Sequence, residues 1–349
     1  MFRKILVIGS YPYINRPNTI GGATSLVKSL LDYLSNKNIK YYFISSNIFG
    51  FKFSYIINYL NIILRAFLFI PLSKNVIINC SKNGTFYLFP LIFIICKIFN
   101  KKIIFRMFGG NFISLYEKSN YISNFFLFHC LKNCDIIFFE TKYIIKYCKK
   151  IFPKHKNILW FPNVRASQNI NNNVKYEKRF VFMSHIKFSK GIENIIEAAN
   201  LLSEDYIFDF YGPIIDNKYN SEYISSMKNC NYLGILKGDD VQEKLKTYSI
   251  VLLPTFYEGE GYPGIIIEAF SLGLPVIATN LKGISEIVEN NKSGLLVPIK
   301  DSNKLYEAII SINDNNYKAY SKNAIIAFDN FNSDSIYPKI INYIDKSII

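Results

Sequence analysis

Short apolar runs alternate with amphipathic segments along most of the chain, and this alternation begins twice. The first series predicts a helix at Ala23–Ser35 and strands at Ile5–Gly9, Tyr41–Ser45, Val76–Asn79, Ile103–Phe105 and Ile136–Glu140. Short apolar strands that are separated by helices are typical of a parallel sheet covered on both faces.

The pattern restarts after a polar stretch at 168–178, which includes three consecutive asparagines. The second series predicts strands at Phe180–Ser184, Tyr206–Tyr211, Ile250–Leu253, Val276–Thr279 and Leu295–Val297, and helices at Gly191–Leu202, Val241–Thr247 and Gly264–Ser271. We therefore expect an α/β chain of two doubly wound, Rossmann-like domains, 1–164 and 165–332, facing each other across a cleft. Residues 333–349 are weakly amphipathic and are expected to form a helix that returns to the first domain.

Two segments of the first domain, Phe51–Pro71 and Phe86–Phe99, are unusually apolar and aromatic. Lys97 interrupts the second before it reaches the roughly 18 to 20 residues that a membrane-spanning helix needs. We expect both segments to supply mainly core helices. Because basic residues lie at their margins, they also suggest a shallow peripheral contact between the first domain and an anionic membrane.

The composition limits the class of protein and its partners. Half of the 349 residues are apolar and 19% are charged, which predicts a folded chain. The net charge is +15, but the lysines are scattered and form no basic block interleaved with aromatic residues. We therefore expect no nucleic-acid partner, and the basic surface favours phosphorylated substrates or anionic lipid.

Compartment and cofactor chemistry also leave traces in the sequence. The apolar run near the N-terminus is too short for a signal peptide, which predicts a cytoplasmic protein. Six cysteines lie mostly within apolar segments and include no Cys-x-x-Cys pair. They predict buried thiols rather than a disulfide framework or a metal site.

The segment at 254–279 carries the clearest chemistry. A predicted strand leads into a loop rich in glycine and acid, and a helix begins near Gly264, where free amides and the helix dipole suit a diphosphate. Glu260 lies on the loop and Glu268 about one turn into the helix, so both carboxylates can converge on one ligand. Acids before a helix often serve only its dipole, but Glu268 lies among apolar residues and needs a partner, which a bound ribose would provide.

This segment resembles the signature of the retaining, GT-B-fold glycosyltransferases of family 4, which include bacterial surface-polysaccharide enzymes. Glu260 and Glu268 occupy its two acidic positions, and Gly273-Leu-Pro-Val276 fits the strand that follows. The resemblance continues through Gly283, Glu286 and Gly294–Val297. It implies that Glu268 binds the ribose of a nucleotide sugar and that Glu260 is a catalytic residue facing the donor sugar. It also implies that three amides surround the sugar and phosphate, those of Gly261, Tyr262 and Gly264.

The start of the second domain resembles the family's cationic segment. Lys190 stands at the position of the family's lysine, whereas His185 stands where an arginine is expected and Lys187 lies close by. The resemblance implies that these groups bind the diphosphate and that Lys190 takes part in catalysis. Cations stabilise the negative charge of a departing nucleoside diphosphate, so we expect no metal and no other cofactor.

Two loops of the first domain complete the resemblance. Gly21 and Gly22 are similar to the family's glycine loop, which approaches the donor phosphate or the acceptor, although a simple turn explains two glycines equally well. Their distance from the first strand excludes a dinucleotide-binding fingerprint. A second loop follows the strand at 103–105, and Phe108 stands in it where many relatives have a histidine. Its candidates for lining the cleft are Arg106, Gly109 and Asn111.

Together these features predict a retaining glycosyltransferase that moves a sugar from a nucleoside-diphosphate sugar to a saccharide or lipid-linked saccharide. Synthesis of capsule, O-antigen or exopolysaccharide is the expected setting, with the protein in the cytoplasm and peripheral on the inner face of the plasma membrane. Three alternatives stay open at this point: a nucleotide-sugar epimerase of the same fold, a phosphorylase-like enzyme, and a non-catalytic sugar-nucleotide-binding protein.

Overall fold

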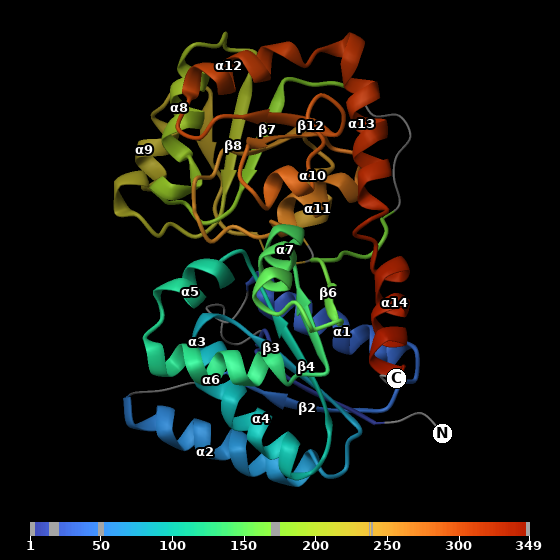
Figure 1. Ribbon diagram of the computed structural model, residues 1–349. Coiled ribbons are helices and arrows are strands. Elements are labelled where there is room, and N and C mark those ends of the chain that lie inside the picture. The colour runs from blue at the N-terminus through green and yellow to red at the C-terminus, as the bar shows by residue number, and fades with distance from the viewer. Residues whose placement is uncertain are drawn as a thin grey trace. The chain divides into compact units, whose positions relative to one another are not determined.

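The computed structural model divides the chain into two compact units (Figure 1). The first unit comprises Met1–Asn163 and Ile336–Ile349, and the second comprises Val164–Ser335. The structure describes residues 4–13, 21–47, 52–168, 175–236, 238 and 240–346, without the side chains of 52–55, 82 and 83. The three consecutive asparagines of the polar stretch at 168–178 lie outside the described residues.

The first unit is built on a six-stranded parallel sheet in the order β2-β1-β3-β4-β5-β6. Its strands are β1 (Ile5–Gly9), β2 (Tyr41–Ser45), β3 (Asn75–Cys80), β4 (Lys102–Met107), β5 (Ile136–Phe139) and β6 (Ile158–Trp160). Its helices are α1 (Gly22–Asn36), α2 (Lys52–Phe69), α3 (Lys82–Phe86), α4 (Leu88–Ile98), α5 (Phe112–Lys118), α6 (Tyr121–Lys132), α7 (Lys142–Ile151) and α14 (Ser333–Asp345), whose first three residues belong to the second unit.

One face of this sheet carries a continuous apolar core. Inward side chains such as Ile78 and Phe105 pack with Ile62 of α2, Phe89 of α4 and Leu127 of α6. The helices α2, α4 and α6 therefore cover the same face of the sheet.

The C-terminal helix α14 belongs to the first unit. The Tyr337 hydroxyl lies 2.8 Å from the Ser29 hydroxyl of α1, and the Tyr337 ring meets Phe161 edge to face. Near the end of the helix, Lys102 of β4 donates a 2.8 Å hydrogen bond to the carbonyl of Ile344. The helix thus contacts α1 and the first residue of β4, although these segments lie far from it in the sequence.

The second unit is built on another six-stranded parallel sheet, in the order β12-β11-β10-β7-β8-β9. Its strands are β7 (Arg179–Met183), β8 (Ile207–Tyr211), β9 (Cys230–Tyr232), β10 (Ile250–Leu253), β11 (Val276–Thr279) and β12 (Gly294–Val297). Its helices are α8 (Ile192–Asn200), α9 (Ser221–Ser225), α10 (Asp240–Leu245), α11 (Gly264–Ser271), α12 (Ser302–Ser311) and α13 (Asp314–Phe328), with short 3₁₀ turns at Phe188–Lys190, Asn217–Tyr219 and Ile284–Glu286.

If the strands are numbered within this unit, their order is that of a dinucleotide-binding sheet. In such a sheet the first three strands are added towards one edge and the next three towards the other, so the order reverses between the first and fourth strands. Here those strands are β7 and β10, which pair side by side through Phe180 and Ile250. In open sheets of this kind, ligands bind beyond the carboxyl ends of the strands at this reversal. The prediction of two Rossmann-like units with parallel sheets is confirmed.

The sequence pattern missed two short strands. Both β6 and β9 have three residues and lie at the edge of their sheets. A strand this short has no periodicity of its own and forms only because a neighbouring strand supplies the hydrogen bonds. Trp160 lies half-buried on β6, and its indole N–H donates to the carbonyl of Glu140.

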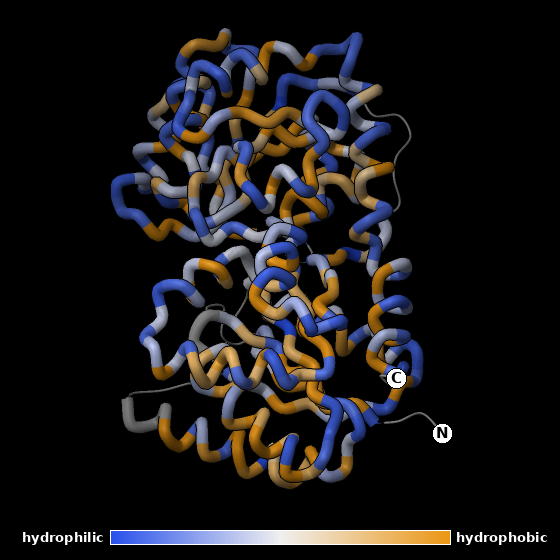
Figure 2. Tube along the Cα trace, in the orientation of Figure 1, coloured by the Kyte–Doolittle hydropathy of each residue, from blue (hydrophilic) through white to orange (hydrophobic). Residues whose placement is uncertain are grey.

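The expectation that the most apolar helices are mainly core is only half correct. The inward sides of α2 and α4 are buried, but their outward sides expose large apolar residues (Figure 2). Among the residues that the structure describes, no helix combines the length and hydropathy needed to cross a bilayer.

The six cysteines are free and buried, as predicted. Burial raises the pKa of Cys96 in the first unit to about 12, although neighbouring lysines oppose the shift. It raises the pKa of Cys230 in the second unit to about 12 as well, from an ordinary value of 9.0.

Alkaline pH is therefore expected to destabilise both units. Above pH 9 the unfolded chain releases thiol protons that the folded chain keeps, so the free energy of unfolding falls as pH rises, by up to about 1.4 kcal/mol per pH unit for each fully buried thiol. Thermal melts in reducing buffer from pH 8 to 10.5 check this, with Cys96→Ala and Cys230→Ala as variants with a shallower decline. A melting temperature that stays constant over this range would contradict it.

Candidate active site

The loops after β7 and β10 lie at the strand-order reversal of the second sheet and are tied together. The amide of Phe256 donates a 2.9 Å hydrogen bond to the carbonyl of Ser189. Gly191 has φ of +80°, and a Cβ there would lie 2.1 Å from the carbonyl oxygen of Pro254. Only glycine fits this left-handed turn against another backbone, so this residue type allows the two loops to meet.

Lys190 and Glu260 meet where these loops touch. The Lys190 ammonium forms an ion pair with Glu260 Oε2, and the two side chains are only 10% and 12% exposed. The Thr255 hydroxyl lies 3.2 Å from the same carboxylate oxygen. The structure therefore brings together the two residues predicted to be catalytic and pairs them directly.

Two further basic side chains, Lys187 and His185, lie beside this pair. The Lys187 ammonium lies 4.4 Å and the Lys190 ammonium 5.3 Å from the centroid of the Tyr257 ring. Partial burial lowers the pKa of His185. The nearby charges of Lys190 and Lys187 lower this pKa further, and the charge of Glu260 opposes the shift. Three basic groups therefore surround one carboxylate, and this excess of positive charge favours an anion.

Glu268 lies on α11 and has a partner that the sequence did not reveal. Its Oε1 accepts a 2.6 Å hydrogen bond from the guanidinium Nε of Arg165. The backbone of Arg165 is held by Phe331 and Ser333, whose carbonyl and amide bond to it at 3.0 and 2.8 Å. The inference that Glu268 needs a bound ribose to offset its charge is therefore wrong, because the protein itself supplies a cation.

The remaining predicted donor-site residues hold the loop in place. The buried Tyr262 donates its hydroxyl to Glu286 Oε2 at 2.7 Å. A Cβ at Gly283 would lie 2.3 Å from the carbonyl oxygen of Gly261, so the loop packs directly on the segment that precedes the 3₁₀ turn Ile284–Glu286. Helix α11 begins at Gly264, and the amides of its first turn lack acceptors within the helix.

In the first unit, Gly21 and Gly22 lie at the start of α1. The Gly21 amide donates to the Thr24 hydroxyl at 3.0 Å. A Cβ at either glycine would meet no described residue within 4 Å, and the backbone at Gly21 is extended, with φ of −171°. The conformation at Gly21 therefore does not require glycine.

The second predicted loop of the first unit surrounds a buried arginine. Arg106 is 1% exposed, and none of its guanidinium nitrogens has a hydrogen-bond partner among the described residues. Its guanidinium carbon lies 3.3 Å from the centroid of the Phe161 ring and 4.6 Å from that of Phe108. Burial lowers the pKa of Arg106 to about 10, while Tyr337 and Glu140 oppose the shift. Phe108, which replaces the family's histidine, thus covers a cation.

The two neighbouring candidates differ in exposure from Arg106. Gly109 is half-buried, and its amide donates a 3.1 Å hydrogen bond to Glu140 Oε2. Asn111 is also half-buried and precedes α5 without a capping hydrogen bond from its side chain. Of the three, Gly109 and Asn111 reach the surface and Arg106 does not.

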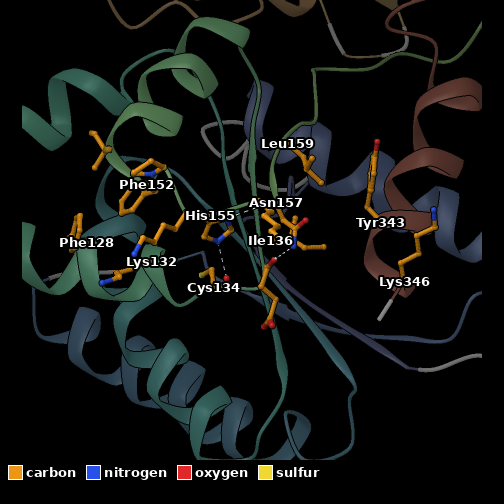
Figure 3. Close-up of a pocket in the computed structure, with 15 residues that line it drawn as sticks. Phe128, Lys132, Cys134, Ile136, Phe152, His155, Asn157, Leu159, Tyr343 and Lys346 are labelled. Atoms are coloured by element: carbon orange, nitrogen blue, oxygen red, sulfur yellow. Dashed lines mark hydrogen bonds between the residues drawn. The ribbon is translucent and has the colours of Figure 1, made fainter. Parts of the chain in front are cut away.

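A groove of about 880 Å³ lies elsewhere in the first unit, at the amino ends of β5 and β6 (Figure 3). His155 in its wall donates from Nε2 to the carbonyl of Cys134 at 2.9 Å and accepts at Nδ1 from the amide of Asn157 at 3.3 Å. These bonds fix the neutral tautomer with the proton on Nε2 and tie the strand beginnings together. The groove lies at the opposite end of the strands from the predicted loops, and its histidine has a structural role.

Comparison with known proteins decides the class of the second unit. Residues 177–315, which contain Lys190, Glu260 and Glu268, match the family model described as glycosyl transferases group 1. We call this matched segment the glycosyl transferase domain. The predicted resemblance to glycosyltransferases is confirmed for this segment. Arg165 precedes the glycosyl transferase domain, which is why the motif at 254–279 did not point to it.

Two curated relatives each match a little over a third of the chain. The chain is 31% identical over 130 residues to the UDP-Gal:alpha-D-GlcNAc-diphosphoundecaprenol alpha-1,3-galactosyltransferase of Escherichia coli. This match covers 36% of this chain and 32% of that enzyme. It is 27% identical over 144 residues to the amylovoran biosynthesis glycosyltransferase AmsK of Erwinia amylovora, covering 38% and 35%. The chain thus matches only about a third of the length of these relatives.

Solved structures extend the likeness to both units. The structure of Anabaena HepE in complex with UDP has a TM-score of 0.73 and 14% identity, covering 97% of this chain and 98% of that chain. The same protein in complex with UDP-glucose has a TM-score of 0.70. At this identity the likeness shows the fold, and it confirms the predicted GT-B class for the whole chain.

Proposed function

We propose that the protein is a retaining glycosyltransferase that moves a sugar from a nucleoside-diphosphate sugar to a saccharide or lipid-linked saccharide during surface-polysaccharide synthesis. The observation that carries this proposal is the cluster of Lys187, Lys190 and His185 around Glu260 at the strand-order reversal of a group 1 glycosyl transferase domain. The relatives named above are transferases, which favours transfer over the epimerase, the phosphorylase-like enzyme and the non-catalytic binding protein.

In this proposal the cations bind the diphosphate. Negative charge grows on the phosphate oxygen as the bond from the sugar C1 breaks, and fixed positive groups stabilise it without having to reorganise. The Lys190 ammonium turns from Glu260 to the diphosphate. The freed carboxylate then accepts hydrogen bonds from hydroxyls of the donor sugar. The scheme uses no metal and no other cofactor.

The proposed transfer takes place on one face of the sugar. The C1–phosphate oxygen bond breaks, a bond from C1 to the acceptor oxygen forms on the same side, and the acceptor proton passes to the leaving diphosphate. The products are a glycoside of unchanged anomeric configuration and a nucleoside diphosphate.

Arg165 and Glu268 are proposed to hold the ribose end of the donor. The Arg165 guanidinium fixes the position of the Glu268 carboxylate, which keeps a second oxygen for the ribose hydroxyls. The first unit is proposed to hold the acceptor, with Gly21, Gly22, Gly109 and Asn111 as candidate contacts. We place the protein in the cytoplasm, peripheral on the inner face of the plasma membrane, where a lipid-linked acceptor would be presented.

Nucleoside diphosphates are expected to stabilise the protein against heat. Because HepE structures contain UDP and UDP-glucose, we expect UDP to act more strongly than GDP or ADP. A ligand at 100 times its dissociation constant adds about 2.7 kcal/mol, which corresponds to roughly 5–10 °C for a unit of this size. Thermal-shift assays with the three nucleotides, followed by release of UDP from UDP-sugars with and without a saccharide acceptor, test the proposal.

Each alternative gives a different result in these assays. An epimerase would interconvert donor sugars without an acceptor, and a binding protein would be stabilised but release no UDP. No thermal shift with any of the three nucleotides at millimolar concentration would contradict nucleotide-sugar binding altogether.

A further inference from the structure

Three neighbouring helices of the first unit expose apolar stripes to solvent. On α2 the stripe has the helical spacing i, i+4 and i+8, and on α4 it has i, i+4, i+7 and i+11. The exposed residues are Ile56, Ile57, Leu60, Leu64, Phe67 and Leu68 of α2, Tyr87 just before α4, Leu91, Ile94 and Ile98 of α4, and Tyr121, Ile122, Phe125 and Phe126 of α6. We call this surface the three-helix apolar face.

The same helices are apolar on their inner sides. Ile62 of α2, Phe89 of α4 and Leu127 of α6 are buried in the core of the first sheet. Figure 2 shows α2 and α4 coloured as hydrophobic along most of their length. A helix that is apolar all round is normally buried or in contact with lipid, so the fold leaves an apolar surface that is much larger than core packing requires.

The segment that contains α2 and α4 carries charge of one sign. Between Asp32 and Glu117 the chain has eight lysines and two arginines but no aspartate or glutamate. Lys74, which follows α2, and Lys97, which lies on α4, are exposed. Such a surface is complementary to a layer that is apolar inside and negatively charged at its boundary.

We infer that the three-helix apolar face docks on an anionic lipid bilayer, with α2, α4 and α6 lying at its surface; this deepens the peripheral contact proposed above and rests on that part of the proposed function. The apolar stripes enter the boundary between head groups and acyl chains, and the lysines meet the phosphates. Tyr87 and Tyr121 suit this depth because their rings are apolar and their hydroxyls remain hydrated.

A second copy of the chain fits this face less well. A two-fold contact through the same surface would bring two sets of exposed lysines, such as Lys74 and Lys97, towards each other. An anionic bilayer removes the apolar stripes from water and neutralises the cations at the same time.

Vesicle flotation of the full chain tests this inference. We expect binding to vesicles of 70% phosphatidylcholine and 30% phosphatidylglycerol, and at least tenfold weaker binding to phosphatidylcholine alone. The double variant Leu68→Asp, Ile98→Asp changes two side chains that are 67% and 64% exposed and should weaken binding at least tenfold. The matched control, Leu201→Asp with Ile235→Asp, changes residues of the second unit that are 57% and 67% exposed and should bind as the wild type does.

Stabilisation by UDP, measured on all variants, separates this inference from the proposed transfer. The Leu68, Ile98 variant should keep the wild-type thermal shift, since its substitutions are far from the glycosyl transferase domain in the sequence. Equal vesicle binding by the two double variants, or no binding by the wild type, would overturn the inference. Sedimentation of the wild type as a dimer that the Leu68, Ile98 variant abolishes would assign the face to a second copy instead.

Discussion

Replacing Glu260 with glutamine is expected to slow the turnover of donor sugar at least about 100-fold, the usual cost of removing a group that stabilises charge in a transition state. Glutamine keeps the size of the side chain and its contact with Thr255, but it removes the negative charge that faces Lys190. The release of UDP from UDP-sugar, with and without acceptor, measures the effect.

The same loop provides a matched control. Glu258 lies two residues before Glu260 and is exposed, so Glu258→Gln makes the same chemical change without touching the buried ion pair. We expect this control to keep the wild-type rate.

Stability measurements separate chemistry from folding. Breaking a buried ion pair by removing one partner costs about 3–5 kcal/mol, so Glu260→Gln should also lower the melting temperature. Rates are therefore compared below the melting temperature of the variant. A Glu260→Gln protein that is folded at the assay temperature and keeps the wild-type rate would remove this carboxylate from the reaction.

The variant Gly191→Ala is expected to destabilise the second unit by about 3 kcal/mol or more. The left-handed backbone costs a residue with a Cβ about 1–2 kcal/mol, and crowding in a packed interior adds about 1–3 kcal/mol. Here the added Cβ would lie 2.1 Å from the Pro254 carbonyl oxygen, so one of the two loops must move. For a unit of this size we expect a fall in melting temperature of roughly 6–12 °C.

Gly234 provides the control that separates strain from crowding. It also has a positive φ, of +87°, but a Cβ there would meet nothing within 4 Å in the part of the chain that the structure describes. Gly234→Ala should therefore show only the cost of the backbone conformation. Equal melting temperatures for the two variants would mean that the loop after β10 leaves room beside Gly191.

Displacement of the loops should also reduce nucleotide binding. Lys190 immediately precedes Gly191, and its ammonium reaches Glu260 only because the two loops are in contact. We therefore expect Gly191→Ala to lose most of the thermal stabilisation by UDP, whereas Gly234→Ala should retain it.

The regular elements of both sheets were predictable from the sequence. Strands such as Ile5–Gly9 and Ile250–Leu253 have the predicted bounds, because buried parallel strands are continuous apolar runs between polar turns. The three-residue edge strands β6 and β9 were not, because a segment that short becomes a strand only by pairing with its neighbour.

The candidate site was predictable where its residues are close in sequence. Glu260, Gly264 and Glu268 lie on one loop and the helix it starts, so their spacing indicated where they would stand on the fold. The contact between Glu260 of this loop and Lys190 could be anticipated only through the family resemblance, because the two residues are 70 positions apart in the sequence.

The sequence by itself determined the class of fold, the acidic loop and the type of chemistry, because apolar periodicity and motif spacing act over a few neighbouring residues. Only the tertiary structure paired Glu268 with Arg165, 103 positions away, and enclosed Arg106 between two phenylalanine rings. It also decided which sides of α2, α4 and α6 face solvent. These outcomes depend on the order of strands in each sheet, which brings distant segments together and which no local pattern encodes.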